Sequence, residues 1–499
     1  MTSPTEYRNA PPKAGAMIEA LRGLGYSTAT AVADLVDNSI AAGARIVDVA
    51  FAWAGTHSYV TLRDDGRGME GTELDRAMRL GYQSPLDARA DGDLGRFGLG
   101  LKTASFSQCR RLTVASRRGS HTSCLRWDLD VLASSPDDQW RLLVGAADGS
   151  HERLDPLLAV PHGTLVLWEN LDRIVTPGFS EQNFLDLIDV VERHLAMVFH
   201  RYLFGQQPKL RITINGTTVA PWDPFLLTHH ATWSSPIVRP APGVAAQCHV
   251  LPHKDRLDDA QYELAGRPDG WTAQQGFYVY RNERLLVTGS WLGLGRGRSW
   301  TKEEAHRLAR IRLDIPNSAD ADWKIDIRKS TARPPVAVRQ VLTHLMEDTC
   351  KRARRVFAHR GRIVVRARSE PVMPVWRAEH RADGIRYRID RSHPAVAAVL
   401  HNAGPEARQV EAMIRVVEAT VPVQRIWLDT AEGRETPRTG FGATAPDEVR
   451  AVADVLFRDL VLRQGLSPKL ARERLLHTEP FNDYPDLVAG FPDRPAIDA

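Results

Sequence analysis

A helix with acidic and amide residues in its middle is the feature that most constrains this chain. The segment AVADLVDNSIAAGA follows Ser27, a residue that can cap a helix, and contains Gly43, which can end one. At 3.6 residues per turn, apolar side chains share one face, and Asp34, Asp37 and Asn38 share the other. Solvated faces normally carry Lys, Glu and Arg, but this face has no cation. The pattern indicates the wall of a binding site, with an ordinary solvated face as the alternative.

The spacing of these polar residues suits a phosphate ligand held through a metal ion. Asp34 and Asn38 are four residues apart, so their side chains lie one helical turn apart. An amide oxygen is a hard ligand for a magnesium ion that phosphates already hold. A carboxylate one turn away can polarise an attacking water.

A first glycine-rich segment, DDGRGMEG, follows two strand-like stretches, ARIVDVAF and YVTLR. It spells GxGxxG at Gly66, Gly68 and Gly71, but Asp64 and Asp65 stand directly before the glycines and would repel a pyrophosphate. No acidic residue closes a second strand about 20 residues on, as a dinucleotide fold would require. The favoured interpretation is that Asp64 accepts a hydrogen bond from a base amino group, while the glycines let the base approach the backbone.

A second glycine-rich segment, GYQSPLDARADGDLGRFGLGLKTASFS, runs into a helix. It differs from a P-loop because Leu101 separates Gly100 from Lys102. Gly98 and Gly100 would expose backbone amides at the start of the helix, where its dipole favours phosphate. A flexible surface loop is the alternative.

Taken in order, ADLVDNSIAAGA, LRDDGRGM, LGRFGLGLKTAS and HGTLVLWENL resemble the four nucleotide-binding motifs of the GHKL ATPases. This superfamily includes gyrase B subunits, heat-shock chaperones, histidine kinases and MutL, and the MORC-like branch is the most similar. The four motifs span residues 27–171. The resemblance implies a Bergerat-fold ATPase, an α/β sandwich that takes ATP and Mg²⁺ as cofactors.

The resemblance also assigns roles to residues of each motif. Asn38 would coordinate magnesium, and Asp64 would bind the adenine amino group with support from Thr164. The other residues implied in ATP binding line the base or wrap the phosphates: Gly66, Gly68, Met69, Gly95, Gly98, Leu99, Gly100 and Lys102.

One departure from the family concerns the general base. The family usually has Glu four residues before the metal-binding Asn, whereas this chain has Asp34, which is one methylene shorter. A general base must come within hydrogen-bond reach of its water. Hydrolysis is therefore expected to be slow, to use Asp37 by another route, or to be absent.

The segments LRITINGTTVAPWDPF, GFYVYRNERLLV and DADWKIDIRKSTARPP resemble the transducer domain of the GHL subset, a ribosomal S5-like α/β domain. In that domain a basic residue reaches the terminal phosphate, and by position Lys329 is favoured over Lys324. Either cation suits the developing charge on phosphate oxygens. A surface strand with alternating apolar and charged residues is the alternative for KIDIRKS.

The stretch KRARRVFAHRGRIVVRAR contains eight Lys or Arg residues and no acid. The preceding residues have a helical pattern, so part of this charge would continue along one rigid element. Such an element can track a nucleic-acid backbone with salt-dependent, largely sequence-independent affinity. A solvated linker is the alternative. The DNA-contacting residues predicted here are Lys351, Arg352, Arg354 and Arg355.

These segments predict four regions along the chain. Residues 1–195 would form the ATP-binding domain and residues 196–350 the transducer domain. Residues 351–370 would be a basic linker or helix extension. Residues 371–499 would form an accessory α+β domain, in which helices surround the short strand RIWLD.

Composition places few further limits on the chain. The formal net charge of +4 favours no particular partner, so only the location of the charge can argue for nucleic acid. The four cysteines form no CxxC pair, which fits a reducing compartment. No stretch of about 18 consecutive apolar residues occurs. We therefore expect a cytoplasmic protein without membrane contact.

As a member of this group, the chain is expected to be a Mg-dependent ATP hydrolase that forms a homodimer when ATP binds. Duplex DNA is the expected client, and prokaryotic MORC-like proteins resemble components of restriction or phage-defence systems, which suggests protein partners from such a system. The alternative is a poorly hydrolysing nucleotide sensor that regulates a partner protein, in a signalling or chaperone-like role.

Overall fold

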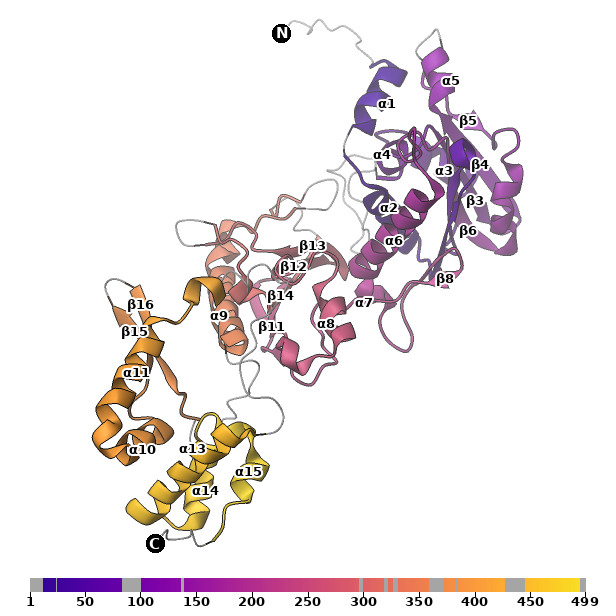
Figure 1. Cartoon of the computed structure of the whole chain (residues 1–499). Helices are drawn as coiled ribbons and strands as arrows, with labels where there is room; N and C mark the ends of the chain where they lie inside the picture. Colours follow the sequence, from indigo (N-terminus) through magenta and orange to yellow (C-terminus); the bar gives the residue numbers. More distant parts are fainter. Residues whose placement is uncertain are drawn as a thin grey trace, which may run out of the picture. The chain divides into compact units, whose positions relative to one another are not determined.

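The chain divides into two compact units in the computed structural model, Met1–Gly361 and Arg362–Ala499 (Figure 1). Both units contain helices and strands, which confirms the predicted α/β class. The structure describes residues 12–23, 25–82, 100–135, 139–295, 299–317, 322–325, 331–358, 372–381, 384–426 and 445–493.

The first unit begins with an eight-stranded sheet in the order β5-β4-β3-β6-β2-β1-β7-β8. Its neighbouring strands are antiparallel except for β1 and β7, which run parallel. The strands are β1 Ile46–Ala52, β2 Tyr59–Asp64, β3 Arg111–Arg118, β4 His121–Asp128, β5 Leu143–Val144, β6 His162–Glu169, β7 Arg211–Ile214 and β8 Thr217–Thr218.

Helices cover one face of this sheet, where Figure 1 shows α2, α4 and α6 together. Alternate residues of a strand point to opposite faces, so Val166 and Trp168 join the core under these helices. Leu165 and Leu167 point the other way and pack with Leu157 of a short 3₁₀ helix, His151–Ala159. The helices are α1 Ala14–Arg22, α2 Thr28–Ala41, α3 Gly71–Met78, α4 Gly100–Phe106, α5 Leu129–Ser134, α6 Glu181–Val198 and α7 His200–Leu203.

The helix α2 has the ends that its sequence predicts. The Ser27 side chain accepts a hydrogen bond from the Thr30 backbone N–H at 3.2 Å, and the Thr30 hydroxyl oxygen accepts one from the Ser27 N–H at 3.0 Å. This reciprocal capping box satisfies backbone donors that the first turn leaves free. After the last turn, Gly43 has a φ of +77°, which favours glycine.

The hairpin β7–β8 turns at Asn215 and Gly216, as the Asn-Gly pair predicts. Both residues have positive φ, at 48° and 83°. The sequence analysis assigned this segment to the second domain, which was predicted to start at residue 196. That assignment of the hairpin is wrong, because β7 pairs with β1 and Ile212 and Ile214 are buried in the core of the first sheet.

A second sheet completes the first unit, with six strands and the main order β10-β11-β14-β12-β13, while β9 pairs with β11. The long helix α9, Val336–Ala358, packs against it through Leu342, Met346 and Cys350. The remaining elements are β9 Trp233–Ser234, β10 Val238–Ala241, β11 Val244–Val250, α8 Asp259–Gly266, β12 Gly276–Arg281, β13 Arg284–Ser290 and β14 Ala309–Ile315.

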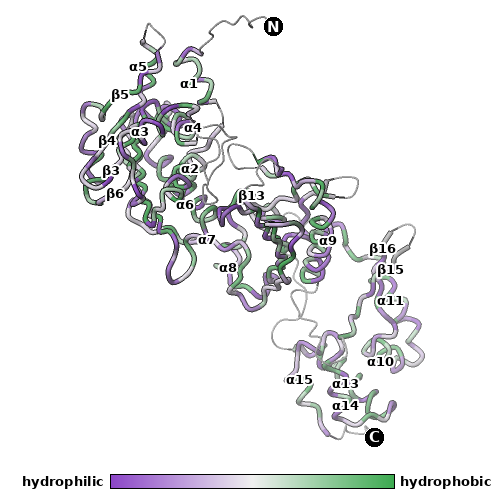
Figure 2. Tube along the Cα trace, turned by 180° about the vertical axis from the view of Figure 1, so that it is seen from behind, coloured by the Kyte–Doolittle hydropathy of each residue, from purple (hydrophilic) through white to green (hydrophobic). Residues whose placement is uncertain are grey.

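The second unit has its own core around Phe457, Leu475 and Phe481, and Figure 2 shows hydrophobic residues along its helices α13 and α14. Residues Arg425 and Ile426 are helical, so the strand predicted at RIWLD is wrong where it is described. The described strands of this unit, β15 and β16, form a hairpin instead. Its elements are β15 Trp376–Arg381, β16 Gly384–Ile389, α10 Pro394–Asn402, α11 Ala407–Ala419, α13 Asp447–Arg458, α14 Pro468–Leu476 and α15 Pro485–Ala489.

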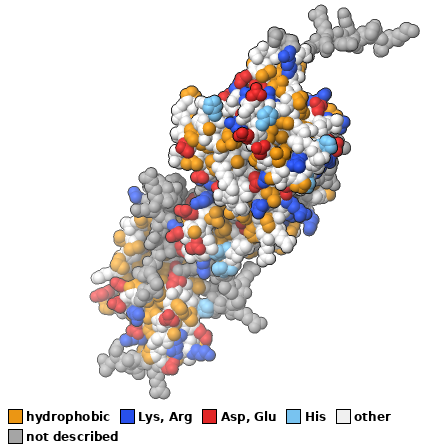
Figure 3. Space-filling model, turned by 90° about the vertical axis from the view of Figure 1, so that its right-hand side faces the viewer, with side chains coloured by type: hydrophobic (Ala, Val, Ile, Leu, Met, Phe, Trp, Pro, Cys, Tyr) orange, Lys and Arg blue, Asp and Glu red, His pale blue; other side chains and the backbone are white. Residues whose placement is uncertain are grey.

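No described helix combines the length and the apolar character that crossing a bilayer requires. On the face drawn in Figure 3, acidic and basic side chains are interspersed.

The strands β2 and β6 approach closely at Gly163 of β6, beside the loop after β2. A Cβ at Gly163 would lie 2.1 Å from the Asp64 carbonyl oxygen, and the φ of Gly163 is +149°. At Gly149, φ is +77° but no atom lies within 4 Å of the corresponding position. We expect Gly163→Ala to lower the free energy of unfolding by about 1–3 kcal/mol more than Gly149→Ala, the usual cost of overpacking. Equal losses in denaturant unfolding would contradict this close approach.

Candidate functional site

The polar residues of α2 do not share one environment. Asp34 and Asp37 are only 4% and 1% exposed, whereas the Asn38 side chain is exposed. Two carboxylates inside a protein require partners, because an unpaired buried charge is costly. The alternative of an ordinary solvated face is therefore wrong for both acids.

Asp34 is held by a residue that lies just before the helix. The Tyr26 hydroxyl donates a hydrogen bond to Asp34 Oδ2 at 2.9 Å. Burial raises the pKa of Tyr26, and the Asp34 charge raises it further, so the phenol stays protonated and remains a donor. Gly100, the first residue of α4, lies on the same side, since a Cβ there would be 3.8 Å from Asp34 Oδ2.

Asp37 is paired with Arg284 of β13, a residue that the sequence analysis did not identify. Arg284 Nε lies 3.1 Å from Asp37 Oδ1 and 3.0 Å from Oδ2, and its NH2 nitrogen lies 3.9 Å from Asp34 Oδ1. Burial and the Arg284 charge lower the pKa of the neighbouring His194 to about 4, so that imidazole is neutral at pH 7. The pairing disfavours Asp37 as an alternative general base.

Asp64 ends β2 and is the buried acceptor that the sequence predicted for a base. Its Oδ1 accepts hydrogen bonds from the backbone N–H groups of Gly66, at 2.9 Å, and Thr164, at 3.2 Å. Its Oδ2 accepts one from the Ser39 hydroxyl at 2.9 Å. Burial raises the pKa of Asp64, while these three donors oppose that rise. The carboxylate is thus held in one orientation between α2, β2 and β6.

The loop after β2 passes so close to its neighbours that side chains are excluded. A Cβ at Gly66 would lie 2.9 Å from both the Ala42 Cβ and Asp64 Oδ1. A Cβ at Gly68 would lie 1.9 Å from the Arg117 carbonyl oxygen, and the φ of Gly68 is +66°. Only glycine fits these two positions without movement of the backbone.

Ser116 of β3 joins two of the predicted site residues, and the sequence analysis did not identify it. Its hydroxyl oxygen accepts a hydrogen bond from the Met69 N–H at 2.8 Å and lies 2.9 Å from Thr164 Oγ1. The structure therefore brings Asp64, Met69 and Thr164 together through β2, β3 and β6. Strand pairing alone decides this contact, which no local motif reveals.

Lys102 was predicted to contact phosphate, but its ammonium group has protein partners in this structure. Lys102 Nζ donates to the carbonyl oxygens of Ala77, at 2.8 Å, and Arg79, at 3.0 Å, where α3 ends. Burial lowers the pKa of Lys102 to about 8. The predicted residues Gly95, Gly98, Leu99 and Lys329 lie outside the described residues. Lys324, the alternative to Lys329, is exposed.

The donor set suits a nucleotide with a magnesium ion. The exposed Asn38 carboxamide can supply one oxygen ligand, and the buried Asp64 carboxylate can accept from a base amino group. Within the described ranges, no cluster of three or more His, Cys, Asp or Glu residues has the geometry to hold a metal ion. A magnesium ion at Asn38 would therefore take most of its ligands from phosphate oxygens and water.

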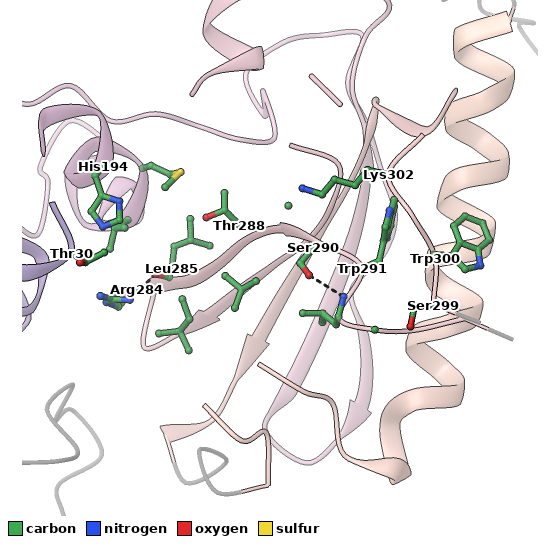
Figure 4. Close-up of a pocket in the computed structure, with 17 residues that line it drawn as sticks. Thr30, His194, Arg284, Leu285, Thr288, Ser290, Trp291, Ser299, Trp300 and Lys302 are labelled. Atoms are coloured by element: carbon green, nitrogen blue, oxygen red, sulfur yellow. Dashed lines mark hydrogen bonds between the residues drawn. The ribbon is translucent and has the colours of Figure 1, made fainter. Parts of the chain in front are cut away.

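A cleft of about 590 Å³, which Arg284 helps to line, lies between α6 and β13 (Figure 4). Thr30 and His194 line it from the first-sheet side, and Trp291 and Lys302 line it from the second-sheet side. Asn38 and Asp64 are not among its lining residues. Arg284, which pairs with Asp37, is one of the residues that line this cleft.

The predicted DNA-contacting residues lie on one rigid helix. Lys351, Arg352, Arg354 and Arg355 are all exposed on α9, around the buried Ala353. The Arg352 guanidinium lies 3.9 Å from the centre of the Trp233 ring, and Lys351 lies 3.5 Å from Asp348. Arg354 and Arg355 extend the basic surface beyond these two contacts.

The comparisons with known proteins agree with this geometry. Residues 26–164 match the family described as "Histidine kinase-, DNA gyrase B-, and HSP90-like ATPase". This range contains the whole set formed by Tyr26, Asp34, Asn38, Asp64 and Thr164.

Two kinds of curated relatives are similar to parts of the chain. "ATPase morc-1" of Caenorhabditis elegans is 26% identical over 232 residues, covering 38% of this chain and 27% of the relative. "DNA mismatch repair protein MutL" of Rhodospirillum rubrum is 30% identical over 192 residues, with the same two shares. MutL of Halobacterium salinarum is 41% identical over 93 residues, 18% of this chain and 14% of the relative. The chain thus spans about a quarter or less of the length of these relatives.

The match and the site together define the class of protein. The chain contains an ATPase domain of the GHKL superfamily. Its relatives include MORC-like and MutL proteins, so the family predicted from the four motifs is confirmed.

The buried ion pair between Asp37 and Arg284 should contribute more to the free energy of unfolding than a surface ion pair does. Asp37→Asn would leave a buried guanidinium without its main countercharge, which typically costs about 3–5 kcal/mol. Asp75→Asn is the control, because Asp75 pairs with Arg79 at 2.7 Å on the surface, where such pairs contribute about 0–1 kcal/mol. Equilibrium unfolding should separate the two variants clearly. Similar small losses would argue against the pair.

Proposed function

We propose that the chain binds Mg·ATP between α2, the loop after β2 and the start of α4, and hydrolyses it. The observation that supports this most directly is Asp64. Its buried carboxylate is oriented by three donors and lies beside Gly66 and Gly68, two positions that only glycine fits. A buried, oriented carboxylate can accept a hydrogen bond from an adenine amino group.

In this proposal each residue has a separate task. Asn38 provides an oxygen ligand for magnesium, and Asp64, with Thr164 and Met69, holds the adenine. Asp34 accepts a proton from the attacking water. A bound magnesium ion would supply charge that neutralises the phosphates, and Lys329, in preference to Lys324, would stabilise the terminal phosphate. The shorter Asp34 side chain makes turnover slow.

We further propose that ATP binding drives formation of a homodimer. The support is the similarity to MORC-like and MutL proteins, together with a second sheet that contacts the site through Arg284. The alternative function, a nucleotide sensor with little turnover, uses the same site and the same dimer. A restriction or phage-defence setting would supply protein partners.

A nucleotide titration tests the main proposal. We expect calorimetry to detect ATP binding by the parent chain, and Asp64→Asn to weaken it by about tenfold to a hundredfold, since a mismatched buried partner costs about 1–3 kcal/mol. Asp34→Asn should keep ATP binding but abolish magnesium-dependent phosphate release. Size measurement with a nonhydrolysable ATP analogue should show a dimer that is absent without it.

The surface variant Asp75→Asn is the matched control and should bind ATP like the parent. No heat on titration of the parent with ATP would reject the proposal. Binding and dimerisation without phosphate release would favour the sensor over the ATPase.

A second candidate function is binding of duplex DNA through α9. The exposed Lys351, Arg354 and Arg355 on one helix favour it, because a rigid row of cations can follow a phosphate backbone. Arg352 contributes less in this proposal because its guanidinium stacks on Trp233.

We expect the triple variant Lys351→Ala/Arg354→Ala/Arg355→Ala to bind duplex DNA more weakly at every sequence tested. The plot of log affinity against log salt should become shallower by about three in slope, about one for each lost phosphate contact. ATP affinity should not change. A titration at several salt concentrations measures both effects.

The control variant is Arg76→Ala/Arg79→Ala/Lys209→Ala, which removes the same charge from exposed positions elsewhere in the first unit. If both triple variants weaken DNA binding equally, net charge rather than α9 determines it, and the DNA interface proposed here is wrong.

A further inference from the structure

We infer that Arg284 is a positioning residue of the ATPase site, supplied by the second sheet to orient the general base Asp34. The inference rests on the proposed function, because Asp34 acts as a general base only if the chain hydrolyses ATP. It adds a residue outside the matched range 26–164 to the machinery of the site.

The guanidinium of Arg284 is fixed by contacts on several of its nitrogens. Nε contacts both carboxylate oxygens of Asp37, at 3.1 and 3.0 Å, and NH1 donates to the Leu285 carbonyl oxygen at 3.0 Å. NH2 lies 3.9 Å from Asp34 Oδ1, at ion-pair distance. Because Arg284 is only 4% exposed, water screens these interactions poorly.

A rigid turn delivers Arg284 to this position. Arg284 is the first residue of β13 and follows Asn282 and Glu283, whose φ values are +47° and +66°. The turn is tied to the first core, since the Tyr202 hydroxyl donates to the Asn282 carbonyl oxygen and Lys209 Nζ lies 2.6 Å from Glu283 Oε2. The position of Arg284 therefore depends on packing between the two sheets of the first unit.

The two oxygens of Asp34 have neighbours from different parts of the chain. Tyr26 donates to Oδ2, and Arg284 faces Oδ1 from the second sheet. A carboxylate with one partner can rotate, whereas partners at both oxygens define its plane. This matters more for Asp than for Glu, because the shorter side chain has less reach to correct an error in position.

The charges around Asp34 explain why one arginine serves both acids. Asp37 lies one turn along the same helix, and His194 of α6 is neutral at pH 7, with a pKa of about 4. Tyr26 is a neutral donor. Of His194, Tyr26 and Arg284, only Arg284 therefore supplies positive charge to the two neighbouring carboxylates. Its loss would leave two buried acids without this positive charge.

The test compares Arg284→Met, Arg284→Lys and the parent as full chains. ATP affinity is measured by calorimetry, and phosphate release is measured over a range of ATP concentrations to separate kcat from KM. We expect Arg284→Met to lower kcat by about tenfold to a hundredfold, since misplacement by about 1 Å can cost about a hundredfold. ATP affinity should stay within about threefold of the parent value, and Arg284→Lys should recover part of kcat because it restores a cation.

The control is Arg312→Met, which removes an arginine from β14 of the same sheet, where Arg312 Nε lies 3.0 Å from Asp314 Oδ2. Its kcat should match the parent value. If Arg284→Met does not fold, the double variant Asp37→Asn/Arg284→Met replaces it, because removal of both partners avoids an unpaired buried charge.

A kcat within about twofold of the parent in the folded variant would overturn the inference. A parent that binds ATP but releases no phosphate would overturn it as well, because there would be no base to position. These outcomes differ from a parent that gives no heat with ATP, which rejects the proposed function itself.

Discussion

The contact between Arg284 and the two carboxylates of α2 is the constraint on which the rest of the site depends. Burial of Asp34 and Asp37 is unfavourable unless positive charge or donors accompany them. Tyr26 supplies one donor from the adjoining loop, and Arg284 supplies the charge from a strand almost 250 residues later in the chain. The first sheet and its helices therefore do not complete the site by themselves, and the packing of β13 beside α2 is part of its chemistry.

A second constraint is the close approach of backbone around Asp64. The carboxylate, the glycine loop and the start of β6 share a space in which added Cβ atoms at Gly66, Gly68 and Gly163 would collide with backbone or with Asp64. In exchange, the polar groups satisfy one another: Asp64 has three donors, and Ser116 links Met69 with Thr164. Such a hydrogen-bonded network favours one arrangement of these groups. In the proposed complex, Asp64 lies where a base, not a phosphate, would bind, so a buried acid there is compatible with a polyanionic ligand.

The two proposed activities place different demands on the first unit. ATP chemistry requires atoms held to fractions of an ångström, which buried contacts among α2, β2, β6 and β13 provide. DNA binding of the non-specific kind requires only a row of exposed cations on a rigid support, and α9 provides that support because its opposite face is anchored in the second core. Arg284 belongs to the first set although it lies in the sheet that carries α9. The second sheet therefore carries both Arg284 and the helix α9, on which the proposed DNA-binding residues lie.

Four ordered motifs determined the superfamily, the α/β class and the ends of α2, because turn residues, caps and glycines act locally and leave a direct record in the sequence. From the sequence, Asp34, Asn38 and Asp64 were also recognised as candidate site residues. The hairpin β7–β8 was predicted in the wrong domain, because a strand pattern does not show which sheet the strand joins. Arg425 and Ile426 were predicted to lie in a strand, but they are helical. Only the tertiary structure decided that Asn38 is exposed while Asp37 is buried, that Lys102 contacts carbonyl oxygens, and that Arg284 faces both acids. Those outcomes depend on contacts between segments far apart in the chain, whose spacing no local pattern encodes.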